Sequence, residues 1–492
     1  MPSRLDTRAA SGMVFVFFLC LYVLTLKGVS TGDEMMHYDL VQRILTTGRG
    51  DLPPGKYDPE TKPGMTGFVA RGRDHSVYLG LPHGLAVASL PLGAVGLAVD
   101  RLFNVQTDVD PLAQSSADDM RKAFAAFRRR PSALLTTAIN PLVSALTVAM
   151  FFGLAAQLAG SLRDGLRMTL LLGLATAVWP YATNYWTQPI AGFFLLASLY
   201  VCWSAGNALT WRYAFCAGLL AGGAFLCRFD TLLLSVWLLL FCALRASGPW
   251  ARRCAIAFHF STGLASLLVL QAAWNVYRFG DWLQVGTAVQ SWRLFRGDVI
   301  SVLPLMVVSP YRGLLAYSPA LILGLVGLTL LFKKDWRLAA TIGGLSVTAL
   351  VFFSAFGFWR SDATWGPRFL VPVTPFLLLP AALNVRRWAV GFWVFLAIGF
   401  AIQVPAVLAV HDPAALIDFH APFRRDPWQH FWQWDAVAQS RSMLSGNIEL
   451  WWLASPVRAG IGFFIACVGG IAGFRAARSC APEAIDSPVL TS

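Results

Sequence analysis

Residues 31–39 of this chain are Thr-Gly-Asp-Glu-Met-Met-His-Tyr-Asp, and they directly follow an apolar segment that ends near residue 29. The acidic pair Asp33 and Glu34 therefore stands where a membrane-spanning helix would leave the bilayer. Ionisable groups next to hydrocarbon are energetically expensive, and they commonly mark a site with a task. This placement decides both the fold class and the place to look for chemistry.

The composition is that of a membrane protein. Of the 492 residues, 56% are hydrophobic and only 13% are charged, whereas soluble domains carry about 25% charged residues. Apolar runs of the length that crosses a bilayer core of about 30 Å recur along the chain. We therefore expect an all-α polytopic membrane protein with twelve transmembrane helices, near residues 11–29, 132–159, 166–182, 189–205, 213–227, 230–245, 255–276, 314–332, 338–358, 369–385, 388–410 and 457–474.

The distribution of basic residues predicts the topology. If residues 81–103 do not cross, six short loops rich in Arg and Lys fall on the side of the N-terminus, which should then be the cytoplasm. The first outer loop is then 30–131, with helices near 34–47 and 81–103 lying along the membrane, and the basic cluster 128–130 departs from the rule. Residues 411–456 form an aromatic-rich outer loop, and 457–492 form the last span and a cytoplasmic tail.

The same composition argues against several other classes. The net charge of +13 is explained by Arg and Lys at span ends, which fix topology and contact headgroups. No basic domain stands apart from the membrane, so nucleic-acid binding is not expected. The eight cysteines form no Cys-x-x-Cys pair and are expected to be packing residues.

Five polar motifs converge on the predicted outer face. They are Gly32-Asp-Glu34, Arg71-Gly-Arg-Asp-His-Ser-Val-Tyr-Leu-Gly-Leu-Pro-His83, Trp179-Pro-Tyr-Ala-Thr-Asn-Tyr-Trp-Thr-Gln188, Ser309-Pro-Tyr-Arg-Gly-Leu-Leu-Ala-Tyr-Ser-Pro319 and Trp359-Arg-Ser-Asp-Ala-Thr-Trp-Gly-Pro-Arg368. Arg228 and Asp230 interrupt an apolar stretch at a further outer turn. Arginines can hold a phosphate through forked, charge-assisted hydrogen bonds. A carboxylate can take the proton from an attacking hydroxyl or amine.

Each of these residues also has a structural interpretation. Thr31 or Asp33 would cap the helix that follows. Arg312 and Arg368 would extend to lipid headgroups, and Arg228 would form a structural ion pair with Asp230. His83 would be a hydrogen-bonded packing residue. The functional interpretation rests on the convergence of all five motifs on one face.

With these motifs, the chain resembles the GT-C superfamily of membrane glycosyltransferases, which take sugars from polyprenyl-phosphate carriers and include protein O-mannosyltransferases and aminoarabinose transferases of lipid A. Gly32-Asp-Glu-Met-Met-His-Tyr38 is similar to the acidic pair that follows the first span in that family. Residues 78–91 stand where the family has its second juxtamembrane helix. The resemblance covers about residues 11–385. Leu81-Pro-His-Gly84 departs from the Lys- or His-Pro-Pro segment of better-known members, so His83 is a loose match.

The resemblance implies a catalytic core over residues 1–410 and an inverting transfer, with Asp33 as the catalytic carboxylate and Glu34 as its neighbour. We expect Arg312, Arg368 and Arg228 to bind the donor phosphate, and Tyr78, His83, Tyr311 and Trp365 to contact substrate. The partners would be membrane lipid, a polyprenyl-phosphate-linked sugar and an acceptor glycan, lipid or protein. The expected location is a bacterial inner membrane, with the site facing the periplasm or exterior.

Three questions stay open at this level. Asp33, Glu34 and His83 could share a divalent cation, but their spacing matches no fixed metal motif, so no obligatory cofactor is expected. A transporter or flippase of a lipid-linked sugar could have the same cationic groove, although its polar residues should extend along a path through the membrane. A non-catalytic subunit of an envelope glycan assembly complex is the third alternative.

Overall fold

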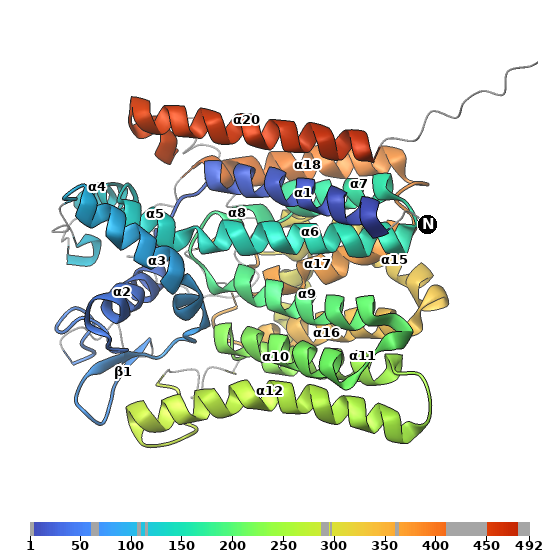
Figure 1. Cartoon of the computed structure of the whole chain (residues 1–492), viewed down its shortest axis with the longest axis horizontal. Coiled ribbons are helices and arrows are strands. Elements are labelled where there is room, and N and C mark those ends of the chain that lie inside the picture. Colours follow the sequence, from blue (N-terminus) through green and yellow to red (C-terminus); the bar gives the residue numbers. More distant parts are fainter. Residues whose placement is uncertain are drawn as a thin grey trace, which may run out of the picture.

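The computed structural model describes residues 4–60, 68–105, 110–113, 117–286, 295, 298–359, 364–409 and 450–480. Helices dominate these residues, and most of them run side by side along one axis (Figure 1). The helices of eight residues or more are α1 (Arg4–Leu24), α2 (Gly32–Thr47), α3 (Gly84–Leu102), α4 (Ala117–Arg128), α6 (Ile139–Ala159), α7 (Leu162–Leu174), α9 (Thr187–Ala205), α10 (Trp211–Cys227), α11 (Thr231–Arg245), α12 (Trp250–Phe279), α13 (Val299–Val308), α15 (Leu321–Lys334), α16 (Trp336–Ala355), α18 (Ala389–Leu408) and α20 (Pro456–Ser479).

Shorter elements connect these helices. They are the short helices α5 (Pro131–Thr137), α8 (Val178–Ala182), α14 (Leu314–Tyr317) and α17 (Thr374–Leu378), and the 3-10 helices η2 (Pro111–Ala113), η3 (Gly206–Ala208), η6 (Arg368–Val373), η7 (Leu379–Leu383) and η11 (Trp451–Ala454). Strands β1 (Val69–Arg71) and β2 (Val77–Leu79) form an antiparallel hairpin in which Ala70 pairs with Tyr78.

The predicted all-α polytopic class is confirmed. Among the described residues, eight helical segments are long and apolar enough to cross a membrane: Thr7–Leu24, Gly84–Leu102, Pro131–Ala159, Thr187–Ala205, Trp250–Phe279, Trp336–Ala355, Ala389–Leu408 and Pro456–Ser479. Shorter apolar segments lie at Trp211–Cys227, Thr231–Arg245, Val299–Val308 and Arg368–Leu383. Helix α13 lies between the predicted spans 255–276 and 314–332 and corresponds to none of the twelve.

Three of the predicted spans are broken rather than continuous. Residues 166–182 divide into α7 and α8, 314–332 divide into α14 and α15, and 369–385 combine η6, α17 and η7. Pro180, Pro319 and Pro372 explain the breaks, because proline lacks the N–H of a helical hydrogen bond and its ring collides with the preceding turn. The breaks at residues 175–177 and 318–320 bring irregular backbone into the protein interior.

Helix α3 has the length and composition of a span, but it is grouped with α2, α4 and α5 at one end of the bundle (Figure 1). The side chain of Asp100 in α3 accepts a hydrogen bond from Ser132 N, with a distance of 3.1 Å. Gly93 of α3 packs closely on Val41 of α2. The position of α3 along the membrane, rather than through it, stays a prediction that this grouping favours.

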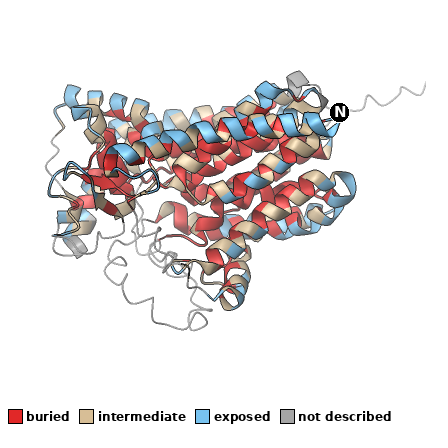
Figure 2. Cartoon of the chain, turned by 90° about the horizontal axis from the view of Figure 1, so that it is seen from below, coloured by how far each residue is buried: buried red, intermediate tan, exposed pale blue. Residues whose placement is uncertain are grey.

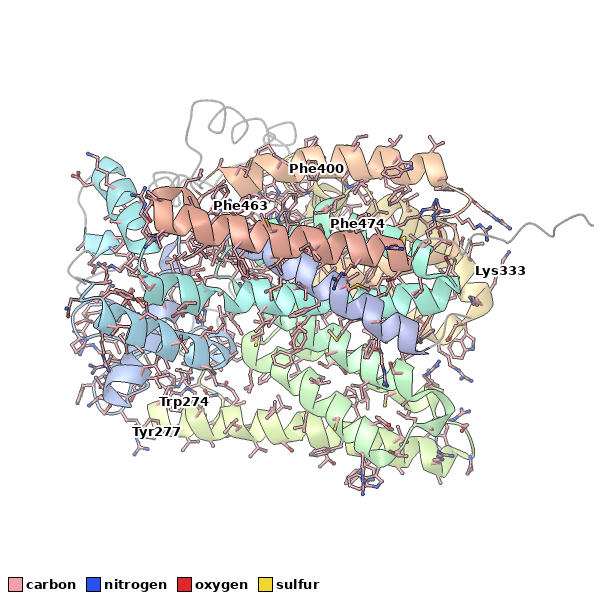
Figure 3. All side chains as sticks on the ribbon, turned by 45° about the horizontal axis from the view of Figure 1, so that its top comes forward. Trp274, Tyr277, Lys333, Phe400, Phe463 and Phe474 are labelled. Carbon is pink, nitrogen blue, oxygen red and sulfur yellow. The ribbon has the colours of Figure 1, made fainter. Side chains whose placement is uncertain are left out.

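The basic loops gather at the opposite end of the bundle. Figure 3 shows Lys333 at one end and Trp274 and Tyr277 at the other. Lys333 lies in the last turn of α15, whereas Trp274 and Tyr277 lie near the end of α12, beside the β-hairpin. The acidic start of α2 is thus separated from these short basic loops by the length of the bundle.

The outer surface of the bundle is apolar. Figure 2 shows a buried interior surrounded by exposed helix faces. Large side chains such as Phe463, Phe464 and Phe474 of α20 are mostly exposed, as are Val390 and Trp393 of α18, and Phe400 and the α20 phenylalanines project outward in Figure 3. Water-soluble monomers rarely expose contiguous apolar surfaces of this kind. These faces are suited to contact with lipid.

The end of α1 and the segment that follows it bind two parts of the molecule that are distant in sequence, the end of α18 and η11. Lys27 Nζ donates to the carbonyl oxygens of Ala406 and Ala409 at the end of α18, the latter at 2.8 Å. The indole Nε1 atoms of Trp451 and Trp452 donate to Val23 O and Leu24 O at 2.7 and 3.0 Å. Most of the predicted outer loop 411–456 lies outside the described residues, as does the tail after 480. The hydrogen bonds of Trp451 and Trp452 place the end of that loop beside the end of α1.

Close packing of α10 on α12 depends on two glycines. A Cβ at Gly218 would collide with the carbonyl oxygen of Phe260, and a Cβ at Gly263 would collide with that of Phe215. Small residues allow membrane helices to approach each other in this way.

We therefore expect Gly218→Ala to destabilise the protein by about 1–3 kcal/mol, because the helices must move apart. Gly343→Ala is the matched control, since Gly343 has no neighbour within 4 Å of the new methyl group. Its expected effect is a small gain, because alanine favours helix by up to about 1 kcal/mol. Thermal unfolding midpoints in detergent measure both variants, and equal midpoints would contradict the packing argument.

Candidate active site

The first turn of α2 separates the roles of its two carboxylates. Thr31 is the N-cap residue, and its side chain accepts from Glu34 N while the Glu34 side chain accepts from Thr31 N, which forms a capping box. Of the two predicted capping residues, Thr31 therefore caps the helix and Asp33 does not. The structural alternative for Asp33 is thereby removed.

Glu34 is fully buried and saturated with hydrogen bonds. Its Oε2 accepts from Ser30 N at 2.6 Å, Ser30 Oγ at 2.9 Å and Thr31 N at 3.0 Å. Its Oε1 accepts from Tyr185 N at 2.9 Å. Burial raises the pKa of Glu34 to about 7, against these hydrogen bonds, which lower it. The predicted part of Glu34 in the chemistry stays a prediction, but its contacts are those of a positioning residue.

Asp33 points in another direction and faces Arg368. The distance from Asp33 Oδ2 to Arg368 Nη1 is 3.7 Å, and the side chains are 26% and 17% exposed. Within the described residues, neither side chain makes a hydrogen bond, and Arg368 Nε is buried without a partner. Desolvation raises the pKa of Asp33, and the charge of Arg368 partly opposes this rise. The pair thus has unused hydrogen-bonding capacity that a ligand could take up.

Aromatic rings hold the Arg368 guanidinium in place. Its central carbon lies 4.4 Å from the ring centroid of Trp186 and 4.9 Å from that of Phe369. A guanidinium over an aromatic face is attracted by the ring quadrupole. Trp186 lies in one of the five polar motifs, but no role was predicted for it. Its ring reaches Arg368 from the loop 183–186 through contacts that sequence spacing does not reveal.

The loop 183–186 is fixed by the segment that carries the acidic pair. Lys27 N donates to Thr183 O at 2.8 Å, and Gly28 forms a parallel bridge with Asn184. Asn140 Nδ2 donates to the carbonyl oxygens of Asn184 and Trp186, at 2.6 and 2.8 Å. Together with the bond from Tyr185 N to Glu34, these contacts fix Trp186 and, through it, the position of Arg368.

Two further predicted arginines lie at the same end. Arg228 forms an ion pair with Asp230 at 2.9 Å, as its structural interpretation required, and its guanidinium carbon lies 5.4 Å from the Phe369 centroid. Arg312 is only 2% exposed and donates to the carbonyl oxygens of Thr364 and Gly366. It therefore does not extend to the membrane surface. Arg228 and Arg368 share the Phe369 ring, and Arg312 binds the backbone just before Arg368.

Tyr311 and Trp365 support this region. The Arg312 guanidinium lies over the Tyr311 ring, with 5.0 Å between its carbon and the ring centroid. Trp365 is buried, and its Nε1 donates to Gln403 Oε1 at 3.0 Å. Tyr181, which the sequence analysis did not select, donates to Trp365 O at 2.8 Å. These residues hold the segment 364–368 in place, and contact between Tyr311 or Trp365 and substrate stays a prediction.

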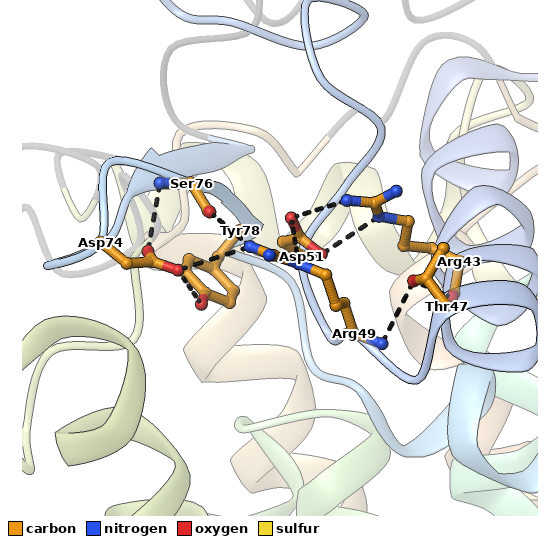
Figure 4. Close-up of polar contacts among 7 residues, drawn as sticks. All are labelled: Arg43, Thr47, Arg49, Asp51, Asp74, Ser76 and Tyr78. Atoms are coloured by element: carbon orange, nitrogen blue, oxygen red, sulfur yellow. Dashed lines mark hydrogen bonds and ion pairs between the residues drawn. The ribbon is translucent and has the colours of Figure 1, made fainter.

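Tyr78 and His83 lie in a different cluster, around the end of α12. Tyr78 OH donates to Asp74 at 3.1 Å, and Asp74 pairs with Arg49 within a network that includes Asp51 and Arg43 (Figure 4). His83 Nε2 lies 3.4 Å from Arg278 Nη1. Burial and Arg278 lower the pKa of His83 well below its ordinary value, so its imidazole is neutral near pH 7. Within the described residues, no hydrogen bond or ion pair joins Tyr78 or His83 to Asp33 or Arg368.

The described residues contain no group of three or more His, Cys, Asp or Glu side chains arranged to hold a metal ion. In particular, Asp33, Glu34 and His83, which we considered as a shared cation site, do not form such a group. The Glu34 oxygens already accept four hydrogen bonds, and His83 lies against Arg278.

Comparison with solved structures finds two crystal structures of ArnT from Cupriavidus metallidurans. One is bound to undecaprenyl phosphate, with 16% identity, a TM-score of 0.44 and coverage of 96% of this chain and 76% of ArnT. The other, in the apo state, has 15% identity, a TM-score of 0.46 and coverage of 96% and 77%. The archaeal oligosaccharyltransferase AglB from Archaeoglobus fulgidus, in complex with an inhibitory peptide and a dolichol-phosphate, has 12% identity, a TM-score of 0.41 and coverage of 96% and 56%.

Each of these similarities extends over 96% of this chain. No protein-family model matches the chain, and no curated protein matches its sequence significantly. At these identities and TM-scores, the chemistry has to be argued from the chain's own residues.

The contacts of Glu34 predict a stability effect that separates it from Asp33. In Glu34→Gln, the amide has only one accepting oxygen, so at least one buried donor among Ser30, Thr31 and Tyr185 loses its partner. We expect a loss of about 1–3 kcal/mol. Asp33→Asn should retain the wild-type stability, because the Asp33 side chain accepts no hydrogen bond in the described structure. Thermal unfolding midpoints measure both, and a wild-type midpoint for Glu34→Gln would show that the capping box contributes little.

Proposed function

We propose that this chain is a membrane glycosyltransferase that moves a sugar from a polyprenyl-phosphate carrier to an acceptor at the end of the bundle where α2 begins. The observation that carries the proposal is the part-exposed pair Asp33–Arg368, in which neither side chain makes a hydrogen bond to another described residue. Arg228 and Arg312 are close enough to act on the charge of Arg368, so positively charged side chains predominate around the Asp33 carboxylate.

In this proposal, Arg368 binds the donor phosphate. A guanidinium offers five N–H donors that match phosphate oxygens in a forked geometry. The aromatic faces of Trp186 and Phe369 orient the guanidinium without using any of these donors. Arg228, whose guanidinium lies near the same Phe369 ring, adds positive charge to the phosphate site. Arg312 acts mainly by fixing the backbone of residues 364–366.

Asp33 acts as the general base. The acceptor hydroxyl or amine attacks the anomeric carbon, its proton passes to the Asp33 carboxylate, and the bond between that carbon and the phosphate oxygen breaks. The electron pair leaves with the polyprenyl phosphate, whose growing negative charge Arg368 stabilises. A direct displacement of this kind inverts the anomeric configuration. Desolvation favours the base role, because it raises the pKa of Asp33 toward the operating pH.

The position of the basic loops supports an outward-facing site. They gather at the end opposite α2, and cytoplasmic loops carry the excess of Arg and Lys in most membrane proteins. In a bacterial inner membrane, this arrangement would turn Asp33 and Arg368 to the periplasm. The donor lipid would reach them from the outer leaflet.

Asp33→Asn should abolish sugar transfer from a labelled polyprenyl-phosphate sugar, because an amide cannot take the acceptor's proton. The loss should be at least about 100-fold, as is typical when a general base is removed. Membrane insertion and thermal stability should be unchanged. Glu60→Gln, at an exposed carboxylate that pairs with Arg71 outside the site, is the control for the loss of another carboxylate. Full transfer by Asp33→Asn would refute the assignment of the base, and absence of transfer by the wild type would favour a transporter or a non-catalytic subunit.

Arg368→Met should raise KM for the donor and also shift the pH profile. The positive charge of Arg368 lowers the pKa of Asp33, so its removal lets that pKa rise further. Because the base must be ionised, the fall in kcat on acidification should then begin at a higher pH than in the wild type. Arg71→Met, at an exposed arginine that pairs with Asp58, is the control. An unchanged acidic limb, together with an unchanged KM, would assign Arg368 to structure alone.

A further inference from the structure

A hollow lined by two arginines and by apolar side chains lies at the opposite end of the bundle, where the short basic loops gather. It has a volume of about 300 Å³ and is enclosed by the start of α7, the start of α18 and the end of α20, which neighbour one another near the N-terminus in Figure 1. Its lining combines Arg163, Leu166, Arg167 and Leu170 of α7 with Phe392 and Trp393 of α18. None of these residues belongs to the Asp33–Arg368 site.

Arg167 is held in the hollow with most of its donors unused. Its Nη1 donates to Asp164 Oδ1 at 2.8 Å, and its guanidinium carbon lies 6.0 Å from the Phe392 centroid. Its Nε and Nη2 make no hydrogen bond within the described protein, yet they are not among the buried unpartnered atoms. They therefore reach accessible space in a fixed orientation, which suits an anionic ligand.

The charge around the hollow is strongly positive. Arg163 is exposed and pairs with no carboxylate in the described part of the chain. Arg386 and Arg387 precede α18, and Arg475 and Arg478 lie near the end of α20, all of them exposed. Asp164 is the carboxylate that contacts the hollow's arginines, and Arg167 already neutralises it. An anion that entered here would find uncompensated positive charge.

The hollow opens next to surfaces that suit acyl chains. Trp393 lines the hollow and is 63% exposed, and the apolar residues Val390 and Val394 on the same helix are exposed as well. Phe474 and Ile471 form a similar exposed surface on α20. Tryptophan is enriched at the level of lipid headgroups. A ligand with a phosphate at one end and hydrocarbon at the other would match both parts.

We propose that this hollow binds an anionic phospholipid, whose phosphate is held by Arg163 and Arg167 and whose acyl chains lie along α18 and α20. Basic pockets between membrane helices on the cytoplasmic side bind such headgroups in other proteins. The lipid would join α7, α18 and α20 at the end of the bundle that is remote from the chemistry. This site is independent of the proposed glycosyltransfer.

The test is a lipid titration of the full-length, delipidated protein in detergent, followed by native mass spectrometry. Phosphatidylglycerol, which is anionic, is compared with phosphatidylcholine of the same acyl chains. We expect wild-type protein to bind phosphatidylglycerol at least about tenfold more tightly, as the loss of one charge-assisted contact corresponds to a factor of this size. Equal binding of the two lipids would overturn the proposal.

Three variants locate the site. Arg163→Ala should weaken phosphatidylglycerol binding about tenfold, and Leu166→Trp should weaken it by filling the hollow without a change in charge. Arg212→Ala, at an exposed arginine that starts α10 outside the hollow, should leave binding unchanged. If Arg163→Ala and Arg212→Ala have the same effect, the preference reflects general surface charge, and the site is refuted.

A displacement experiment distinguishes a phospholipid site from a site for free phosphate. Inorganic phosphate is added to the protein that carries bound phosphatidylglycerol, at constant ionic strength set with chloride. Retention of the lipid supports a phospholipid site, because the acyl chains contribute to binding. Displacement by phosphate but not by chloride would show a site for the small anion and would overturn the lipid assignment.

Discussion

The whole candidate site depends on one buried carboxylate. Glu34 closes the capping box of α2 and at the same time accepts from the backbone of Tyr185, which lies 151 positions later in the chain. In a protein interior next to lipid, a charged oxygen without donors would cost several kcal/mol, so the four donors around Glu34 must be in place when the chain folds. The bond fixes the direction of the first turn of α2 relative to the loop 183–186. Consecutive helical residues point about 100° apart, so the orientation of Glu34 inward directs Asp33 elsewhere, toward Arg368.

The contrast between these two neighbouring acids shows how a membrane protein separates stability from reactivity. Both oxygens of Glu34 accept hydrogen bonds, whereas among the described residues Asp33 has one counter-ion at 3.7 Å and no hydrogen bond. That distance is longer than a hydrogen-bonded ion pair, for which about 2.8 Å is usual. A loosely held pair can exchange partners when a phosphate and a hydroxyl arrive, because little is lost by separating it. The aromatic faces of Trp186 and Phe369 retain the guanidinium during such an exchange, since they do not compete for its N–H groups.

Much of this arrangement follows from local sequence, and the remainder depends on contacts between distant segments. Hydropathy located the spans, and Thr31 with Glu34 three residues later has the pattern of a capping box. Charge placed the motifs 32–34, 179–188, 309–319 and 359–368 at one end, where the structure brings them together. The family resemblance named Asp33 as the catalytic acid, but the residue types alone could not separate it from Glu34, because both are acids and only the helix phase distinguishes them. Sequence also could not place Tyr78 and His83 beside Arg278, because that cluster forms through the hairpin's contact with the end of α12. The prolines that break three spans were visible, but their effect on helix continuity was not anticipated.

The segment between α1 and α2 has one more consequence, for the long connection between α18 and η11. Lys27 binds the end of α18, and Trp451 and Trp452 bind the last carbonyl oxygens of α1. The chain therefore departs and returns within a few residues of the same point, so the distance that residues 410–449 have to bridge is set by contacts outside them. Lys27 and the two tryptophans thus hold both ends of this connection beside the stretch of chain that leads into the acidic turn of α2.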